Sequence, residues 1–311
     1  MTPMPVSSDA PRLRPARGCT PVRPFRPFQR HPAHDGASRR EVGPLTYLAL
    51  TLAVLFSAFP LYWMFVVATR GNAAIAQRPP AIAPGGEFAE NVVRTLENPQ
   101  ANFALGLVNS AIVASVTAVS VVLFCSLAGF ALAKLRFTGR NAITLGVVLT
   151  MMVPVQMAVV PMLIMMDAFD WRGDLKAVIV PFMVTGFGVF MMRQYALQGV
   201  PTELLEAARI DGCSMFRAFW SVVLPALRPP MVVLGLLTFM QNWNEFIWPI
   251  AVLGPDNPTV QVSIHQLNSG YTTDFALMFT GAAFATLPLL LVFVLFGRRL
   301  IGGIMEGAVK G

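Results

Sequence analysis

Six long apolar segments limit what this chain can fold into. A hydrocarbon core about 30 Å thick needs roughly 20 residues of apolar helix to cross it, at about 1.5 Å of rise per residue. The segments that meet this requirement are residues 44–69, 105–133, 142–167, 175–198, 222–253 and 274–297. The fourth is short between Lys176 and Arg193, and it spans only if both side chains extend to the membrane interfaces. The sequence therefore predicts an all-α membrane protein with six transmembrane helices.

The composition excludes several classes of protein. Of the 311 residues, 55% are hydrophobic and 13% charged, which is too apolar for a soluble enzyme. The net charge is +7, but the basic residues gather at segment ends and in the N-terminal tail, so no nucleic-acid face is expected. Cys19, Cys125 and Cys213 have no CxxC spacing, and we find no Ser-His-Asp order. Neither a metal site nor a catalytic site is expected.

The distribution of Lys and Arg predicts the orientation. With the N-terminus inside, eighteen of the 23 Lys and Arg residues lie on the cytoplasmic side and five lie outside. Both termini are therefore expected in the cytoplasm. Residues 1–40 hold eight Arg and eight Pro, which predicts a disordered cytoplasmic tail, with residues 41–311 as the membrane domain. A signal peptide is the competing interpretation, but the apolar stretch 42–69 exceeds the roughly 7 to 15 residues of a signal core.

A polar stretch at about residues 200–221 interrupts the apolar segments. Pro201 and the candidate cap Thr202 predict a helix start, and acidic residues in the first turns favour it. Gly212 is expected to end this helix in a left-handed conformation. A second amphipathic piece from Ser214 to Trp220 can then leave at a new angle. The pattern predicts a helix-turn-helix on the cytoplasmic surface.

This stretch, EAARIDGCSMFRAFWSVVLP from Glu206 to Pro225, resembles the EAA loop of the permease subunits of ABC importers. The family usually has Ile where this chain has Val222, and often Ala where it has Cys213. Neither departure changes size or polarity much. Five further stretches resemble the carbohydrate-uptake branch, of the kind similar to the smaller maltose-type permease: Asn109-Ser110, ALAKLRFTGR, VPVQMAVVP, QNWNEFIWP and the terminal GAVKG.

The resemblance implies a type I importer fold and a division of labour. The loop would dock on a separate ATPase subunit that binds ATP and Mg²⁺, since this chain has no phosphate-binding loop and is expected to bind no cofactor itself. The implied partners are a second permease subunit forming a heterodimer, two ATPase subunits and an extracytoplasmic solute-binding protein, in a bacterial inner membrane. The implied coupling residues are Glu206 for polar contacts, Ala207 and Ala208 for a slim docking face, Asp211 and Gly212 for the turn, and Leu224-Pro225 for the angle into the fifth segment.

A second candidate site lies in the fifth segment. If that segment is one helix, Gln241, Asn244, Glu245 and Trp248 share a face. Amides, carboxylates and aromatic rings suit a polyol, so these residues, with Asn242 and with Gln156 of the third segment, are a candidate substrate pathway. An interhelix polar clamp without substrate contact is the equal alternative.

Two smaller expectations concern prolines of the third segment and a histidine, and several alternative functions remain open. Pro154 and Pro161 are expected to bend the third segment, for packing rather than for a pathway. His265 is expected to be an ordinary surface histidine. A peptide, amino-acid or polyamine permease of the same superfamily, an ion-coupled secondary transporter and a membrane-embedded enzyme remain alternatives to a sugar permease.

Overall fold

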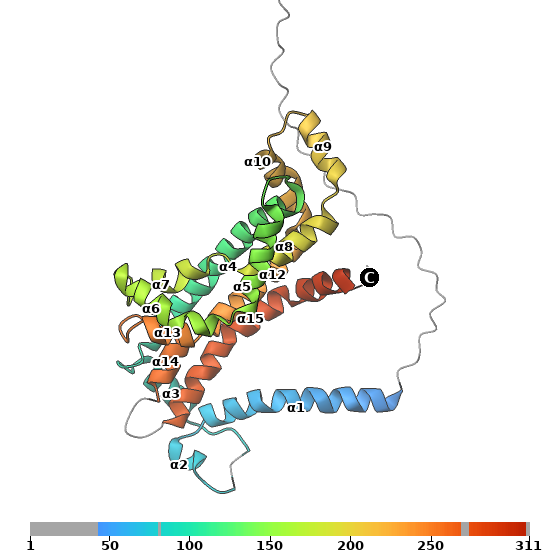
Figure 1. Cartoon of the computed structure of the whole chain (residues 1–311). Helices are drawn as coiled ribbons and strands as arrows, with labels where there is room; N and C mark the ends of the chain where they lie inside the picture. The colour runs from blue at the N-terminus through green and yellow to red at the C-terminus, as the bar shows by residue number, and fades with distance from the viewer. Residues whose placement is uncertain (1–42, 80–81, 269–273, 309–311) are drawn as a thin grey trace, which may run out of the picture.

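The computed structural model describes residues 43–79, 82–268 and 274–308, with the backbone only for 298–308. The predicted tail 1–40 and the last residues of the GAVKG stretch lie outside the described residues. Every regular element in the described ranges is helical, as expected (Figure 1). The α-helices are α1 (Pro44–Ala68), α2 (Asn72–Ile75), α3 (Phe88–Leu96), α4 (Phe103–Lys134), α5 (Arg140–Met152), α6 (Val159–Ala168), α7 (Leu175–Ile179), α8 (Gly186–Gly199), α9 (Thr202–Ile210), α10 (Met215–Ala218), α11 (Leu224–Ala226), α12 (Arg228–Trp243), α13 (Ile247–Val252), α14 (Val260–Gln266) and α15 (Phe275–Ala308). Short 3₁₀ turns cover Val155–Ala158 and Val180–Phe182, and a π-helical turn covers Phe219–Val223.

The membrane spans agree with the prediction in number but not all in shape. Four stretches of the described chain are long and apolar enough to cross a bilayer as single spans: Pro44–Ala68, Phe103–Lys134, Leu175–Gly199 and Phe275–Gly297. Two further helix pairs qualify if each bent pair counts as one span, which makes six. The fourth predicted segment, 175–198, is therefore long and apolar enough to span, despite its short uncharged run.

The third predicted segment is bent by 90° between α5 and α6. Proline cannot donate the helical hydrogen bond, and it also biases the preceding residue toward extended backbone. Val153 is accordingly extended, and the chain restarts after Pro154 as a 3₁₀ turn. The bend predicted from Pro154 is confirmed. Pro161 lies in the first turn of α6, where its missing N–H costs nothing.

The fifth predicted segment, 222–253, was expected to be one helix, and this is wrong at two places. The first break is a bend of 80° between residues 215–226 and α12. It falls at Leu227, before the Arg228-Pro229-Pro230 run, because prolines cannot continue the preceding helix. The second break covers residues 244–246, where the ring of Pro249 would clash with the carbonyl four residues earlier, that of Glu245.

Helix α4 lies at the centre of the fold. It packs along its length against α8 and α12, and α14 covers its outer part (Figure 1). Gly129 makes the close approach to α8 possible, because a Cβ there would lie 2.6 Å from the backbone nitrogen of Arg193. The packing is therefore set by a small residue at the crossing point, as is common between helices in a membrane.

Helices α1 and α15 form a pair at the edge of the fold (Figure 1). Most apolar side chains of α1 are exposed on the isolated chain, and its buried residues, Val66 to Ala68, lie at the end next to α3. The α3 helix is fastened there by Asn91, whose side-chain amide donates to the carbonyl of Ala68 at 3.1 Å. Arg94 of α3 and Asp274 before α15 form an ion pair at 2.6 Å. These two contacts hold the α3 part of the connection between α1 and α4 against the spans.

Candidate functional site

The predicted helix-turn-helix is present as α9 and α10, which project from one end of the molecule (Figure 1). We call residues 202–218 the α9–α10 knob. Gly212 has a φ of 78°, and its N–H donates to the carbonyl of Arg209 at 2.9 Å. The N–H of Cys213 donates to the carbonyl of Ala208, also at 2.9 Å. These bonds satisfy the free carbonyls at the end of α9, so the turn has a defined angle.

The helix starts in the knob differ from the prediction at one residue. Thr202 was expected to cap α9, but it is the first helical residue, and no side chain caps that end. The first turn of α9 still contains Glu203, whose negative charge interacts favourably with the positive end of the helix dipole. The start of α10 is capped instead by Ser214, whose hydroxyl accepts the N–H of Arg217 at 3.3 Å.

The coupling residues divide into an exposed and a buried group. Glu206, Ala207, Asp211 and Gly212 are exposed, whereas Ala208 is buried. Ala208 packs in the chain's own core cluster with Phe219, so it holds the knob rather than adding to its outer face. The same core cluster also includes residues of α4, which therefore helps to hold the knob in place.

An aromatic contact joins the residue after the knob to α4. Phe219 is fully buried, and its ring lies 5.6 Å from that of Phe130 near the end of α4. Leu224 and Pro225 follow in α11, and the bend into α12 comes after them at Leu227. The π-helical turn directly before Leu224 has a local cause, because Pro225 offers no N–H to the helix. A packed chain of short helices thus joins the knob to the fifth span.

The pathway residues surround a cavity of about 400 Å³ in the middle of the fold. It lies where three interrupted segments meet: the bend between α5 and α6, the start of α8, and the break between α12 and α13. The polar residues that line it are Thr150, Gln156, Thr185, Thr238, Gln241, Asn242 and Glu245. The structure therefore brings together five of the six predicted pathway residues, Trp248 included.

Asn244 is the predicted pathway residue that does not line the cavity. The prediction placed it on one helical face with Glu245, but α12 ends at Trp243. Its side-chain amide donates to the carbonyl of Met240 at 2.8 Å and closes the end of that helix. Asn242 makes the same kind of bond, to Thr238 at 2.9 Å, yet still borders the cavity.

Glu245 and Trp248 are tied to the protein as well as to the cavity. One carboxylate oxygen of Glu245 accepts the backbone N–H of Trp248 at 3.3 Å, which satisfies a free donor at the start of α13. The indole N–H of Trp248 donates to the carbonyl of Ala177 in α7 at 3.0 Å. A carboxylate in an apolar span is expensive if it faces hydrocarbon, and the cavity gives Glu245 polar neighbours instead.

Three threonines in the cavity wall were not predicted. Thr150, Thr185 and Thr238 come from α5, the start of α8 and α12. Two of their hydroxyls bond to the carbonyl of the preceding turn, that of Val147 at 2.7 Å and that of Leu234 at 2.8 Å. Only Thr185 carries a local signal, as the N-cap that accepts the N–H of Gly188. No sequence pattern connects three threonines on three separate helices.

The other singled-out residues have ordinary surroundings. The side-chain amide of Asn109 donates to the side chain of Asn257 and to the carbonyl of Pro258, both at 2.8 Å, so α4 holds the connection between α13 and α14. His265 is exposed, and its ring lies 5.4 Å from that of Phe246. In the described chain no group of three or more His, Cys, Asp or Glu could hold a metal ion.

Known membrane-transport proteins resemble this chain in sequence and in fold. The model of the family described as "Binding-protein-dependent transport system inner membrane component" matches residues 125–304. An arabinooligosaccharide transport system permease of Halalkalibacterium halodurans is 35% identical over 204 residues, which are 65% of this chain and 73% of that protein. A lactose transport system permease of Rhizobium radiobacter is 30% identical over 273 residues, 88% of this chain and 98% of that protein. A chain of a bacterial ABC transporter that imports alginate has the same fold, with a TM-score of 0.70 and 19% identity over 82% of this chain and 94% of that one.

Proposed function

The chain belongs to the family of inner-membrane components of binding-protein-dependent transport systems, and from this membership we propose that it is the sugar-translocating permease subunit of an ATP-driven importer. It is a multi-pass protein of the inner membrane. Three features of the importer are proposed beyond family membership: the ATPase that drives it, the solute that it carries and the second permease subunit.

The motor is a separate ATPase that docks on the α9–α10 knob. The knob supports this because Glu206, Ala207 and Asp211 are exposed on it while its inner side is packed into the protein. This combination, an exposed polar face on a rigidly anchored knob, is the observation that carries the proposal. Two ATPase subunits would bind ATP and Mg²⁺, and this chain would bind no cofactor.

Movement of the knob has a short route to the cavity. The π-helical turn and α11 connect α10 to the bend at Leu227, and α12 runs from that bend to the cavity wall at Gln241. Closure of the ATPase pair would push the knob and rotate α12 about the bend. The cavity would then change from facing the cytoplasm to facing the solute-binding protein.

The solute is a sugar. Two relatives are named for arabinooligosaccharides and for lactose, and another, from Yersinia pestis, is named for sn-glycerol-3-phosphate, 28% identical over 86% of this chain. The wall of the cavity supports the same class, because its amides, hydroxyls and single carboxylate can pair with the hydroxyl groups of a polyol. A peptide or polyamine would favour a wall with more charge.

The companion is a second, different permease subunit. The cavity opens on the surface of this chain, and a homologous subunit would close it. A solute-binding protein would deliver the sugar from the outer side, where α3 and α14 cover the spans.

Reconstitution tests the proposal. The complex that co-purifies with this chain is placed in proteoliposomes with its solute-binding protein, and uptake of radiolabelled oligosaccharides is measured with ATP inside. We expect uptake that requires ATP and the binding protein. Uptake driven by an ion gradient without ATP would instead identify a secondary transporter, and binding of peptides but not sugars would identify another branch of the family.

A further inference from the structure

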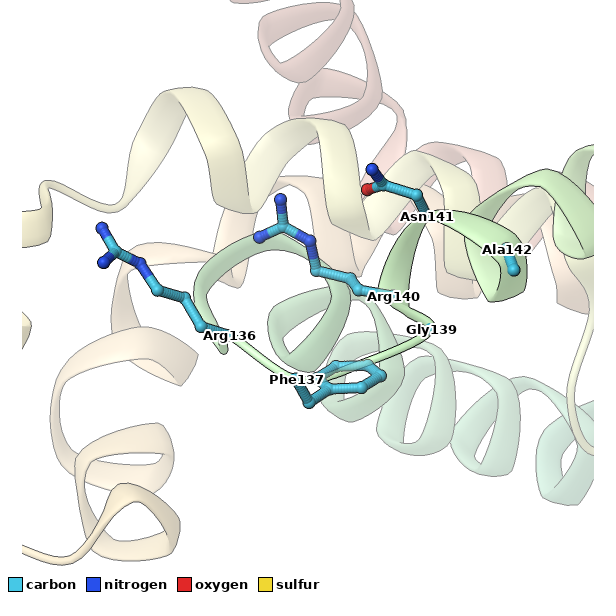
Figure 2. Close-up of a pocket in the computed structure, with 6 residues that line it drawn as sticks. All are labelled: Arg136, Phe137, Gly139, Arg140, Asn141 and Ala142. Carbon is cyan, nitrogen blue, oxygen red and sulfur yellow. The ribbon is translucent and has the colours of Figure 1, made fainter.

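The turn between α4 and α5 forms a second, basic pocket of about 370 Å³ (Figure 2). It is lined by Arg136, Phe137, Gly139, Arg140, Asn141 and Ala142. Figure 2 shows the guanidinium groups of Arg136 and Arg140 and the amide of Asn141 directed to the same side of the turn. The pocket therefore presents several hydrogen-bond donors to one region.

The backbone adds to these donors. Gly139 adopts a φ of 86° and is the N-cap residue of α5, whose first turn has no side-chain cap and no acidic residue. The unpaired N–H groups of a helix start carry partial positive charge, which favours an anion. Two arginine side chains at the same place reinforce that preference.

The charge of the pocket is not neutralised within the described part of the chain. Of the residues that line it none is acidic, and neither arginine takes part in an ion pair in the described part of the chain. Arg140 uses one N–H group to reach the carbonyl of Leu135 at 3.4 Å, which holds its side chain over the turn. Among the described residues no acceptor occupies the other N–H groups of the two guanidinium groups, which can therefore donate to the oxygen atoms of a ligand.

The pocket lies in the short connection between two apolar stretches, the end of α4 and the start of α5. The end of α4 packs beside Phe219, the residue directly after the knob, so the turn is at the same end of the molecule as the knob (Figure 1). Directly beyond it, α5 presents the apolar side chains Ile143 and Leu145, which are 51% and 59% exposed. Phe137 on the rim is 42% exposed. A ligand with a phosphate head and an apolar body would contact both surfaces at once.

We propose that Arg136, Arg140 and the start of α5 bind the phosphate of an anionic phospholipid headgroup in the leaflet on the knob side. The acyl chains would lie along the exposed apolar face of α5. Basic pockets between membrane helices bind such headgroups by the same charge and geometry. Because the same turn is next to the knob and to α8, the lipid would stabilise the end of the molecule that receives the ATPase.

Lipid retention tests the proposal directly. The importer complex is purified in a non-ionic detergent, incubated with phosphatidylglycerol, purified again and examined by native mass spectrometry for bound lipid. We expect the unchanged complex to retain phosphatidylglycerol in preference to phosphatidylcholine. The Arg136→Gln/Arg140→Gln variant should retain about tenfold less, since it loses both charge-assisted phosphate contacts.

Matched variants separate this site from a general effect of charge. Arg78→Gln/Arg228→Gln removes the same charge from two other exposed positions and should retain lipid as the unchanged complex does. Arg136→Lys/Arg140→Lys keeps the charge and should retain most of the lipid. Co-elution of all subunits in each variant shows that the complex is intact.

Three results would overturn the proposal. The first is equal retention of phosphatidylglycerol in the Gln variant and the unchanged complex. The second is binding of inorganic phosphate, but not of phosphatidylglycerol, by the unchanged complex, which would identify a soluble phosphate as the ligand. The third is loss of the ATPase subunits from the Gln variant with lipid retention unchanged, which would identify a protein contact instead. None of these results depends on which solute is transported.

Discussion

The indole N–H of Trp248 donates to the backbone carbonyl of Ala177 at 3.0 Å, and this bond joins α13 to α7. Trp248 is buried, yet it also borders the central cavity. Trp248 thus has a contact that fits an interhelix clamp and a position that fits a substrate pathway, the two hypotheses for the QNWNEFIWP stretch. Both hypotheses stay open, and the first two predictions below separate them.

Replacing Trp248 with Phe should weaken the clamp without opening a large cavity. The carbonyl of Ala177 would lose its partner, and a buried unpaired polar group costs about 1 to 3 kcal/mol. We expect a lower midpoint in thermal unfolding of the detergent-purified complex. Trp220→Phe, at an exposed tryptophan, is the control and should leave the midpoint unchanged. An unchanged midpoint for Trp248→Phe would argue against a structural role of this bond.

Replacing Glu245 with Gln should affect transport more than assembly. Gln keeps an oxygen that can accept the N–H of Trp248, so the start of α13 is preserved. It loses the charge that strengthens hydrogen bonds to sugar hydroxyls, and we expect uptake to fall by about tenfold or more. Uptake in proteoliposomes and subunit co-elution are measured together. Lost assembly with unaltered turnover of the remaining complex would identify Glu245 as a clamp, and Glu97→Gln, exposed on the outer connection, serves as the control.

Replacing Gly212 with Val should abolish transport while membrane insertion continues. A β-branched residue is strained at a φ of 78°, so the turn between α9 and α10 would change its angle. No atom lies near enough to clash with the added Cβ, so backbone conformation alone is tested. Gly212→Asn is the matched control, since Asn tolerates the left-handed region. Normal uptake by the Val variant would contradict a coupling role for this turn.

Replacing Glu206 with Arg should release the ATPase. Its side chain is exposed, so the fold of the permease is expected to persist. We expect about tenfold less ATPase to co-purify, because an ion or hydrogen-bond contact is replaced by repulsion. Glu203→Arg, one turn earlier on the same helix, is the control and should have a smaller effect. Deleting the whole loop would be less informative, because it also removes the buried Ala208 and Phe219.

Replacing Gly129 with Val should destabilise the chain through α4 and α8. The new Cβ would meet backbone atoms of Met192 and Arg193 at 2.6 to 2.8 Å, and backbone cannot rotate away as a side chain can. Overpacking of this kind costs about 1 to 3 kcal/mol. The yield of folded protein in detergent measures the effect. Gly235→Ala is the control, because its Cβ would meet only the end of the Val122 side chain at 3.2 Å.

The sequence by itself determined the class of this protein and its spans. The length of each apolar stretch is enough to locate the six segments, because crossing a bilayer requires about 20 apolar residues regardless of which helices pack together. Gly212 and the acidic residues before it likewise predict the knob, because capping and left-handed turns are decided within a few residues. Pro154 predicts its bend for the same local reason.

Only the tertiary structure decided how these parts form a site. The breaks at Leu227 and at residues 244–246 place Gln241 and Glu245 at the wall of one cavity and turn Asn244 away from it. Thr150 and Thr185 join them from other spans, and Ala208 is turned into the core. Periodicity describes one helix at a time, whereas a cavity depends on which helix ends meet. That depends on packing between distant residues, such as the close approach of α4 and α8 at Gly129.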